Sequence, residues 1–399
     1  MQLLTTEQKD LVLTSMIKLL DKNRRVFLDA NAKDCAAYDL THRAMYDRLV
    51  MNDEKVDGMI EAIKAIRKRK DPIGSVKSEF LHENGMKVVN KTAPFGTIMI
   101  IYESRPDVTV EAAVVAFKSN NKIILKGGKE ARKSNRTLVQ CWHKALNENN
   151  LSEDWITSLE LSRSETQEYL KNPPGPIDLI VPRGGDGLIH FVKSHAKCAV
   201  LISGRGNNFL YVHDDADWQK TIPIILNAKT DKISACNALD KVLINKTIID
   251  LDKKLKELYH ILCENNVEVL ADKNAVLSLP GCSVIGQEEI WSEEFLAMKI
   301  CIGLSENMHS AIGKINTHSG GHSVTIMTEN MKTASSFMDQ IDSAAVYHNA
   351  STRFTDGGQL GIGAELAIST DKLHHRGPLG LDQLVTNKWY VYGNGQVRD

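Results

Sequence analysis

The alternation of short apolar runs with amphipathic segments, which begins near residue 94, restricts the fold of this chain more than any other feature. Segments with helical periodicity separate runs of strand length at 95–102, 122–127, 155–161, 177–185 and 198–204. Strands that alternate with helices at this spacing form parallel sheets, because each helix crosses back over the sheet before the next strand begins. We therefore predict an α/β fold with a doubly wound, mostly parallel sheet.

A second pattern of the same kind occupies the C-terminal part of the chain. Its apolar runs lie at 241–245, 267–272, 298–304, 322–328 and 343–349. With 399 residues, the chain exceeds the roughly 100–200 residues of a typical domain. We expect one domain from 1–75 and 94–228 and a second from 229–370, with the boundary near residue 229.

Two segments fall outside these patterns. Residues 76–93 resemble a β-hairpin that turns at Glu83, Asn84 and Gly85, and they contain too few apolar residues to form a core of their own. Residues 386–399 contain a late aromatic strand. Either segment could pair with another subunit or pack on its own domain, and we expect an oligomerisation arm, hence a homo-oligomer.

Charge and composition argue against several classes of partner. Lys and Arg number 49 against 50 Asp and Glu, so the net charge is -1 and no large basic surface is indicated. This balance disfavours nucleic acid and membrane surfaces. No apolar stretch approaches the roughly 18 residues of a membrane span, and no signal peptide is apparent, so we expect a cytoplasmic protein. Seven scattered cysteines without a CxxC pair indicate neither a disulfide framework nor a metal site.

One cysteine has distinctive neighbours. Cys236 follows Lys229 and Lys232, lies beside the small Ser234, and precedes Asn237. A catalytic thiolate needs nearby positive charge or helix amides to lower its pKa, and space for a substrate. From these residues alone, Cys236 is either a nucleophile or an inert core thiol.

Glycine-bearing loops end several of the predicted strands, at 125–131, 181–187, 202–208 and 355–366. None matches the G-x-G-x-x-G or G-x-x-x-x-G-K-[ST] phosphate-binding motifs. Lys126, Lys129 and Arg183 make two of these loops basic, which favours a nucleotide site. Ordinary turn chemistry is the alternative.

Further basic side chains occur in irregular segments. Ser104 and Arg105 lie between a strand and a helix that opens on Pro106, where amides and a guanidinium can hold an anion. Arg353 and Arg376 occur in Gly-rich segments near the C-terminus. The alternatives are a simple helix cap and structural hydrogen bonding within the loops.

Taken in order, these segments are similar to a known family. The stretches that carry the resemblance are APFGTIMIIYESRPDVT, LKGGKEA, VPRGG, ACNAL, EEFLAMKI, GGHSVTI, NASTRFTDGGQLGIGAELAIST and RGPLGL. They resemble the gamma-glutamyl phosphate reductases, a branch of the aldehyde dehydrogenase superfamily, essentially from end to end. The resemblance implies an aldehyde dehydrogenase-like fold, with a Rossmann-type cofactor domain, an α/β catalytic domain and a small β oligomerisation arm.

The resemblance also implies an activity. It is the NADPH-dependent reduction of L-glutamyl 5-phosphate to glutamate 5-semialdehyde and phosphate, a step of proline biosynthesis, without a metal. Cys236 falls on the family's catalytic cysteine, which forms a thioester. A functional link to glutamate 5-kinase is expected, without a fused kinase domain. A hydrolytic aldehyde dehydrogenase and a non-catalytic binding protein on the same fold are the alternatives.

Several cofactor residues carry over from the family. Lys126 falls on the lysine at the adenosine ribose, and Glu294 on the glutamate at the nicotinamide ribose. In many superfamily members a glutamate takes the place of Lys129, and a lysine there would attract a 2'-phosphate. The other expected cofactor residues are Arg183, Gly184 and Gly185.

The substrate side of the implied site is less regular. The superfamily's oxyanion asparagine aligns with Ser104, and Arg105, Arg353 and Arg376 are candidates for the phosphate and carboxylate of the substrate. The loop SGRGNN at 203–208 departs from the branch pattern. It places Ser203 where hydrolytic enzymes carry a general-base glutamate.

Overall fold

The computed structural model describes residues 2–39, 43–184, 186–279 and 281–398, and the chain divides into two compact units. Unit 1 comprises Met1–Ile202, Gly361–Ala367 and Pro378–Asp399, and unit 2 comprises Ser203–Leu360 and Ile368–Gly377. Each unit has its own parallel sheet and its own hydrophobic core. The predicted α/β class is therefore confirmed.

The sheet of unit 1 follows the predicted strands. Its order is β5-β4-β3-β6-β7, and every neighbouring pair is parallel. The strands are β3 (Thr97–Tyr102), β4 (Lys122–Lys126), β5 (Ile156–Ser158), β6 (Leu179–Arg183) and β7 (Ala199–Val200). All five runs proposed from the sequence contain strands, and the central strands β3 and β6 are buried along most of their length, as expected for a sheet covered by helices.

Helices connect these strands and cover the sheet. Pro106 begins α5 (Pro106–Lys118) as predicted, since its fixed φ suits the first helical position. This helix is buried along nearly its whole length, packed against α4 and α6. The other helices of unit 1 are α1 (Thr6–Lys22), α2 (Arg24–Cys35), α3 (Arg43–Leu49), α4 (Asp53–Lys68), α6 (Arg132–Glu148), α7 (Arg163–Lys171) and α8 (Asp186–His195).

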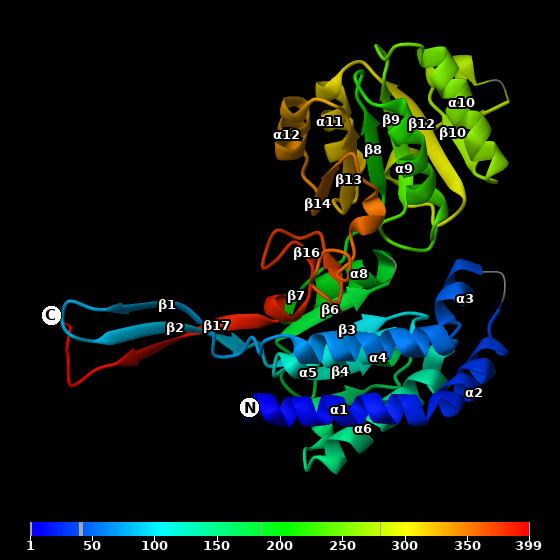
Figure 1. Ribbon diagram of the computed structural model, residues 1–399. Helices are drawn as coiled ribbons and strands as arrows, with labels where there is room; N and C mark the ends of the chain where they lie inside the picture. The colour runs from blue at the N-terminus through cyan, green and yellow to red at the C-terminus, as the bar shows by residue number, and fades with distance from the viewer. Residues whose placement is uncertain (1, 40–42, 185, 280, 399) are drawn as a thin grey trace. The chain divides into compact units, whose positions relative to one another are not determined.

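A three-stranded antiparallel sheet forms the arm of unit 1, which extends away from its helices (Figure 1). The hairpin of β1 (Val76–Leu81) and β2 (Lys87–Pro94) was predicted, and β17 (Val385–Tyr392) pairs with β2 along its full length. Gly85 forms the turn with φ +86°, a value that few other residues adopt at low cost. The C-terminal strand therefore pairs within its own chain.

Unit 2 is built on a seven-stranded parallel sheet of order β11-β10-β12-β9-β8-β13-β14. Its strands are β8 (Asn208–Val212), β9 (Leu239–Asn245), β10 (Glu268–Ala271), β11 (Ser283–Val284), β12 (Lys299–Ser305), β13 (Ser323–Met327) and β14 (Ala345–His348). Apolar clusters lie on both faces of this sheet. Every residue of β8 and β9 is buried, as expected for central strands.

Four α-helices cover this second sheet. They are α9 (Trp218–Thr230), α10 (Leu251–Glu264), α11 (Met308–His318) and α12 (Met331–Gln340). Two short strands, β15 (Ile368–Ser369) and β16 (Gly377–Pro378), follow later in the chain. Within the described parts of both units, no helix is long and apolar enough to cross a membrane.

The division between the units differs from the expected one. It falls between residues 202 and 203 instead of near 229, and residues 361–367 and 378–399 also belong to unit 1. The reason is β8, which lies at the centre of the second sheet between β9 and β13. The Gly-rich sequence at 202–208 predicts only a loop, so the strand that begins where this loop ends was not expected.

Candidate functional site

The turn that carries Cys236 lies directly before β9 and is fixed by the side chain of Asn208. The Asn208 amide nitrogen donates to the carbonyl oxygens of Gly206, Cys236 and Ala238 at 2.9, 2.8 and 2.6 Å. Its oxygen accepts from the Ser323 amide at 3.0 Å, and the whole residue is buried. The backbone of the cysteine is therefore held in place, while its side chain is only partly buried.

The residue after the cysteine is held equally firmly. Asn237 donates to the carbonyl oxygens of Arg353 and Thr355 at 3.1 and 2.9 Å, and Thr352 donates to the Asn237 carbonyl at 2.7 Å. The Arg353 guanidinium donates to the Asn237 side-chain oxygen and, through Nε, to Asp231 at 2.9 Å. Arg353, predicted to bind substrate, thus lies next to the Cys236 turn.

The loop at 203–208 packs against the cysteine so closely that its glycine positions have no room for a side chain. A Cβ on Gly206 would lie 2.1 Å from the Cys236 carbonyl oxygen. One on Gly204 would lie 2.3 Å from Thr370 Oγ1, and one on Gly320 would lie 2.1 Å from the Arg205 carbonyl oxygen. Real Cβ atoms do not approach so closely, so glycine is required here, and the two glycines of SGRGNN were the sequence signal for this contact.

Arg376 belongs to the same region of unit 2. Its Nε donates to the Thr370 carbonyl at 3.1 Å, and its Nη1 donates to Asp342 at 2.6 Å. Hydrogen bonds from Arg376 and Lys372 lower the pKa of the Asp342 carboxyl. Because Thr370 also faces Gly204, Arg376 connects to the loop that covers the cysteine backbone.

The two lysines expected to assist the thiol differ in their burial. Lys229 is fully buried and paired with Asp240 at 2.7 Å, so its charge is not directed at Cys236. This corrects the expectation, and the physical reason is that a buried ammonium group requires a paired carboxylate. Lys232 is exposed two residues after the end of α9.

Burial makes most of the other thiols poor nucleophiles. It raises the pKa of Cys141 and Cys301 to about 12 and that of Cys282 to about 11. It also raises the pKa of Cys35 and Cys198. Because the thiolate is the reactive form, these thiols are almost wholly protonated near neutral pH.

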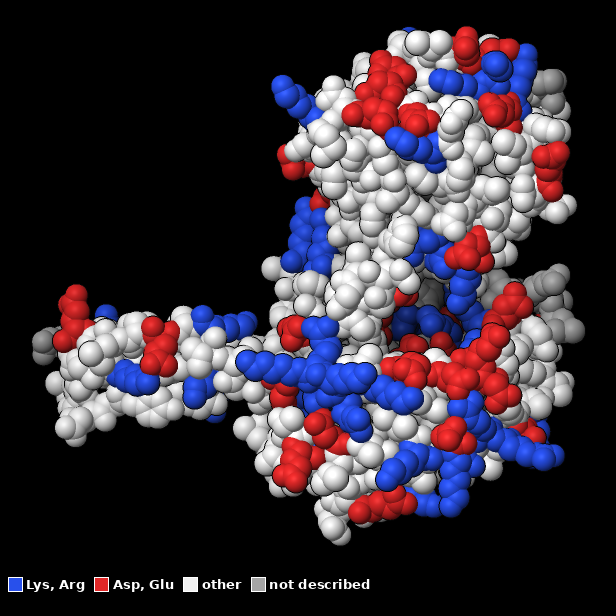
Figure 2. All heavy atoms as spheres, in the orientation of Figure 1, with Lys and Arg blue, Asp and Glu red and all other residues white. Residues whose placement is uncertain are grey.

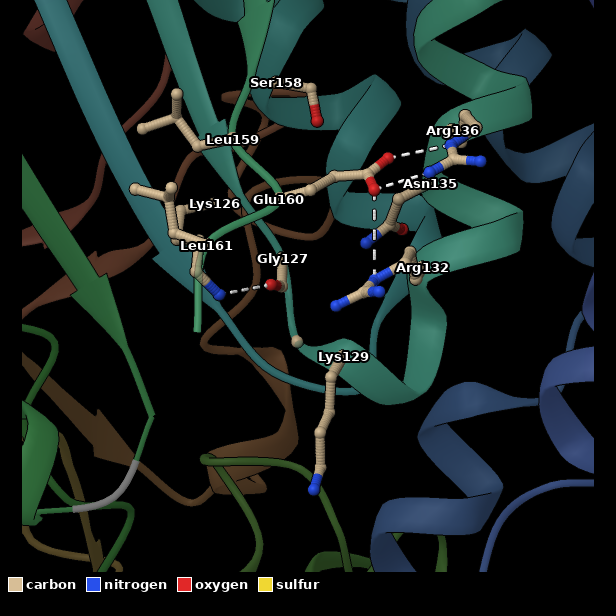
Figure 3. Close-up of a pocket in the computed structure, with 11 residues that line it drawn as sticks. Lys126, Gly127, Lys129, Arg132, Asn135, Arg136, Ser158, Leu159, Glu160 and Leu161 are labelled. Atoms are coloured by element: carbon tan, nitrogen blue, oxygen red, sulfur yellow. Dashed lines mark hydrogen bonds and ion pairs between the residues drawn. The ribbon is translucent and has the colours of Figure 1, made fainter. Parts of the chain in front are cut away.

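Unit 1 contains a solvent-open pocket at the carboxyl ends of β4 and β5 (Figure 3). Such strand ends are where doubly wound sheets bind their ligands. The pocket is lined by Lys126, Gly127, Gly128, Lys129, Arg132, Asn135, Arg136, Ser158, Leu159, Glu160 and Leu161. It therefore contains both lysines predicted from the sequence.

The two lysines occupy different parts of this pocket. Lys126 Nζ donates to the Gly127 carbonyl at 2.8 Å, and burial lowers the pKa of this lysine. Lys129 is exposed, and its side chain extends away from Glu160 (Figure 3). A Cβ on Gly127 would lie 2.1 Å from the side-chain amide nitrogen of Asn135, so this side chain packs directly against the Gly127 backbone.

Arg132, Arg136 and Glu160 are pocket residues that the sequence analysis missed. The Arg136 guanidinium donates to both Glu160 oxygens at 2.8 and 2.5 Å, and Arg132 lies 3.9 Å from the same carboxylate. The hydrogen bonds from Arg136 lower the pKa of Glu160. The i, i+4 spacing of the arginines was a visible signal, but their acidic partner comes from a distant loop.

Ser104 is held in place by hydrogen bonds to Glu130. Its backbone amide and its hydroxyl donate to Glu130 Oε1 at 2.7 and 2.8 Å, and the residue is buried with φ +44°. Positive φ is uncommon outside glycine, so the loop geometry depends on this carboxylate. Glu130 thereby joins the loop after β3 to the loop after β4.

The neighbouring arginine lies in a basic cluster. Arg105 pairs with Asp107 at 3.1 Å. Burial alone would raise the pKa of Asp107, but Arg105, Lys55 and Arg183 together lower it. The predicted cations Arg105 and Arg183 are thus brought to one carboxylate, although they are 78 positions apart in the sequence.

The remaining predicted cofactor residues of this unit follow β6. A Cβ on Gly184 would lie 2.9 Å from Leu188 Cδ2 and 3.0 Å from Glu103 Cδ, so a side chain at this position would displace the ends of both of these side chains. Gly185 lies outside the described residues.

Among the described residues, one group of side chains has the spacing of metal ligands. It consists of His213, Asp214 and Asp215 at the end of β8. His213 Nδ1 lies 2.8 Å from a carboxylate oxygen of each aspartate, and Thr328 donates to Asp215 at 2.6 Å. These groups bond to one another at the surface, away from the glycine contacts of the Cys236 turn.

The buried Lys241 makes the free energy of unfolding of unit 2 depend on pH. Burial lowers the pKa of this lysine from 10.5 to about 8, and the titratable groups around it are Asp240, Cys301, Lys229 and Glu293. Between these two values the unfolded chain holds the proton and the folded chain does not. The free energy of unfolding therefore rises with pH in this window, by about 1 kcal/mol per pH unit.

We predict that wild-type stability, measured relative to Lys241→Met, increases from pH 7 to pH 10. Thermal unfolding midpoints of both proteins, recorded at each pH, measure this difference. Lys246→Met is the matched control, because Lys246 is an exposed lysine just beyond the same strand. A difference that stays constant across the window would contradict the assignment.

Comparison with known proteins places this geometry in context. No protein-family model matches the chain. The gamma-glutamyl phosphate reductase of Idiomarina loihiensis is 40% identical over 99% of this chain and 95% of its own length. The crystal structure of the gamma-glutamyl phosphate reductase of Thermotoga maritima has a TM-score of 0.91 and 39% identity, with 99% of this chain and 95% of that chain covered.

More distant structures share the fold. An acetylating aldehyde dehydrogenase from Geobacillus thermoglucosidasius has a TM-score of 0.70 at 17% identity, with 99% of this chain and 94% of that chain covered. At this identity the likeness concerns architecture alone. The identity of about 40% with the two gamma-glutamyl phosphate reductases extends over nearly the full length and is more than twice as high. The chain therefore belongs to the gamma-glutamyl phosphate reductase family and has the aldehyde dehydrogenase-like fold.

Proposed function

We propose that this protein catalyses the NADPH-dependent reduction of L-glutamyl 5-phosphate to L-glutamate 5-semialdehyde and phosphate, as a cytoplasmic step of proline biosynthesis. The observation that carries the proposal is the Cys236 turn. Its backbone is anchored on both sides by buried asparagine side chains, and Arg353 lies beside it. Such a turn presents a thiol in one fixed position, next to a cation that suits an anionic substrate.

The cysteine would act as a covalent catalyst. The Cys236 thiolate attacks the acyl carbon, a bond between sulfur and carbon forms, and the bond from carbon to the phosphate oxygen breaks, so that phosphate leaves. When bound, NADPH supplies a hydride to the thioester carbon. Cys236 then leaves as a thiolate from the resulting hemithioacetal and releases the semialdehyde, which cyclises to a pyrroline carboxylate.

Arginine side chains would hold the substrate during these steps. Arg353 is a candidate for the leaving phosphate because it lies beside the cysteine turn. Arg105 and Arg376 are the other candidates for the phosphate and carboxylate groups. Each of these two already pairs with an aspartate, so substrate would compete with or extend an existing ion pair.

The cofactor fits the chemistry of the pocket in unit 1. The pocket opens at the carboxyl ends of parallel strands, and it is basic. Lys126 would contact the adenosine ribose, while Lys129 would attract the 2'-phosphate. Arg183, Gly184 and Glu294 are the further proposed cofactor residues.

The loop at 203–208 favours reduction of the thioester over its hydrolysis. Ser203 occupies the position of the glutamate that activates water in hydrolytic aldehyde dehydrogenases, and a hydroxyl is a weak base near neutral pH. Water attack on the thioester would therefore be slow. This disfavours the hydrolytic alternative, and a shaped nucleophile site disfavours a purely binding protein.

The arm suggests a homo-oligomer. Every residue of β1 is exposed, and apolar side chains such as Phe80, Leu81, Trp389 and Val391 are open to solvent. Figure 2 shows uncharged atoms over much of the visible face of the arm. A three-stranded sheet with little support gains stability from a partner, and we propose a second copy of this chain. A functional link to glutamate 5-kinase would follow from the instability of an acyl phosphate.

The function is tested by the Cys236→Ser variant. We expect NADPH oxidation with L-glutamyl 5-phosphate to fall at least about a thousandfold, while NADPH binding is retained, because a serine hydroxyl is not ionised near neutral pH. Cys263→Ser is the matched control, since that thiol is exposed. Substantial turnover by Cys236→Ser would contradict the covalent mechanism.

The fate of the thioester is tested in the reverse direction. With glutamate semialdehyde and NADP⁺, we expect sustained NADPH formation only when phosphate is added. Absorbance at the NADPH band, with and without phosphate, measures this. Steady formation of free glutamate without phosphate would support the hydrolytic alternative instead.

Cofactor preference is tested at Lys129. We expect Lys129→Glu to reduce the preference for NADPH over NADH by about 10- to 100-fold, because a carboxylate repels the 2'-phosphate. The ratio of kcat/KM for the two cofactors is the measurement. Lys133→Glu, another exposed position just beyond the pocket, is the control. Equal ratios in wild type and Lys129→Glu would argue against this contact.

Association through the arm is tested with Phe80→Asp combined with Val391→Asp. We expect the molar mass from light scattering to fall toward that of one chain, because charges in an apolar interface are costly to bury. Leu373→Asp, an exposed apolar residue elsewhere, is the control. A wild-type molar mass that already equals that of one chain would contradict the proposed homo-oligomer.

A further inference from the structure

Two charged residues at the start of β9 hold the segment around Glu294. Asp240 accepts a hydrogen bond from the Phe295 backbone amide at 2.9 Å. Lys241 donates to the Glu293 carbonyl at 2.8 Å. The residues immediately before and after Glu294 are therefore attached to two successive residues of one strand.

The segment needs this support because its backbone is unfavourable. Leu296 has φ +48°, which is a genuine outlier for a bulky residue. It lies outside regular helix or strand, in a stretch that connects η4 (Glu288–Ser292) to β12. Lys241 also lies over the Phe295 ring, with Nζ 3.5 Å from the ring centroid. Contacts from outside the segment thus stabilise a conformation that the chain would not adopt alone.

A third residue orients the anchor. Lys229, in the last turn of α9, pairs with the other oxygen of Asp240 at 2.7 Å, and both side chains are buried. Buried ion pairs contribute little net stability compared with apolar residues of similar volume. The pair instead orients the Asp240 carboxylate, because it leaves the second oxygen directed at the Phe295 amide.

The same strand is connected to the nucleophile. Asp240 lies four residues after Cys236, and all of β9 is buried, so little movement is available between them. The turn before the strand fixes the cysteine, and the first residues of the strand fix the Glu294 segment. Strand β9 therefore sets the distance between these two positions within unit 2.

We propose that Lys229, Asp240 and Lys241 are positioning residues that hold the Glu294 carboxylate in register with Cys236, so that the glutamate can orient the nicotinamide ribose. This inference rests on the proposed function, because it assigns Glu294 to the cofactor. It adds three residues that do not themselves touch substrate or cofactor.

The first experiment needs no cofactor. Hydrogen exchange of the peptide that contains residues 293–297 is measured in the unliganded wild type, Lys241→Met and Asp240→Asn. We expect exchange in both variants to be at least about tenfold faster than in wild type. Lys299→Met is the matched control, because Lys299 lies 5.4 Å from the same Phe295 ring and pairs with Glu268. Unchanged exchange in both variants would overturn the proposal.

The second experiment links the anchors to Glu294 by a double-mutant cycle. The dissociation constant for NADPH is measured by fluorescence for wild type, Lys241→Met, Glu294→Gln and the double variant. We expect Lys241→Met to weaken binding about tenfold in the wild-type background and less than about twofold in the Glu294→Gln background. Cys236 labelling rates check that each variant is folded, and Asp240→Asn replaces Lys241→Met if the latter is not.

The outcomes separate the inference from the proposed function. Equal weakening in both backgrounds, or none in either, would overturn the positioning role while leaving the function intact. A wild-type protein that neither binds NADPH nor reduces L-glutamyl 5-phosphate would refute the proposed function, and with it the cofactor part of this inference. Hydrogen exchange would then still report whether the anchors hold the segment.

Discussion

The side-chain amide of Asn208 is the interaction on which unit 2 depends. It lies at the first residue of the central strand β8 and bonds to the loop before that strand, to the Cys236 turn and to the amide of Ser323 on β13. A buried amide with its hydrogen-bonding capacity used in this way fixes three separate segments at once. Its replacement by an apolar residue would leave several backbone groups unsatisfied, including the carbonyl of the cysteine.

In unit 1, Glu130 has the corresponding role. It joins the loop after β3 to the loop after β4 through the amide and hydroxyl of Ser104. The superfamily asparagine that aligns with Ser104 serves as an oxyanion donor, whereas the hydroxyl here is already engaged. In the proposed mechanism, donors other than this hydroxyl would stabilise a developing oxyanion.

The sequence predicted what depends on local pattern and missed what depends on tertiary pairing. The apolar runs predicted the strands of the first sheet and Pro106 predicted a helix start, because burial and proline geometry are local properties. The unit boundary was placed too late, since β8 follows a Gly-rich loop and its central position depends on pairing with β9 and β13. Lys229 was expected near the thiol by sequence proximity, but the side chain pairs inward with Asp240.

The path of the chain through the two units has a consequence for synthesis on the ribosome. Unit 1 is begun first, but β17, which pairs with the full length of β2, follows the whole of unit 2 in the chain. The whole of Ser203–Leu360 emerges in between. During that interval β2 has an unpaired edge, which is a site for unwanted strand addition. The unit that is started first is therefore the unit that is finished last.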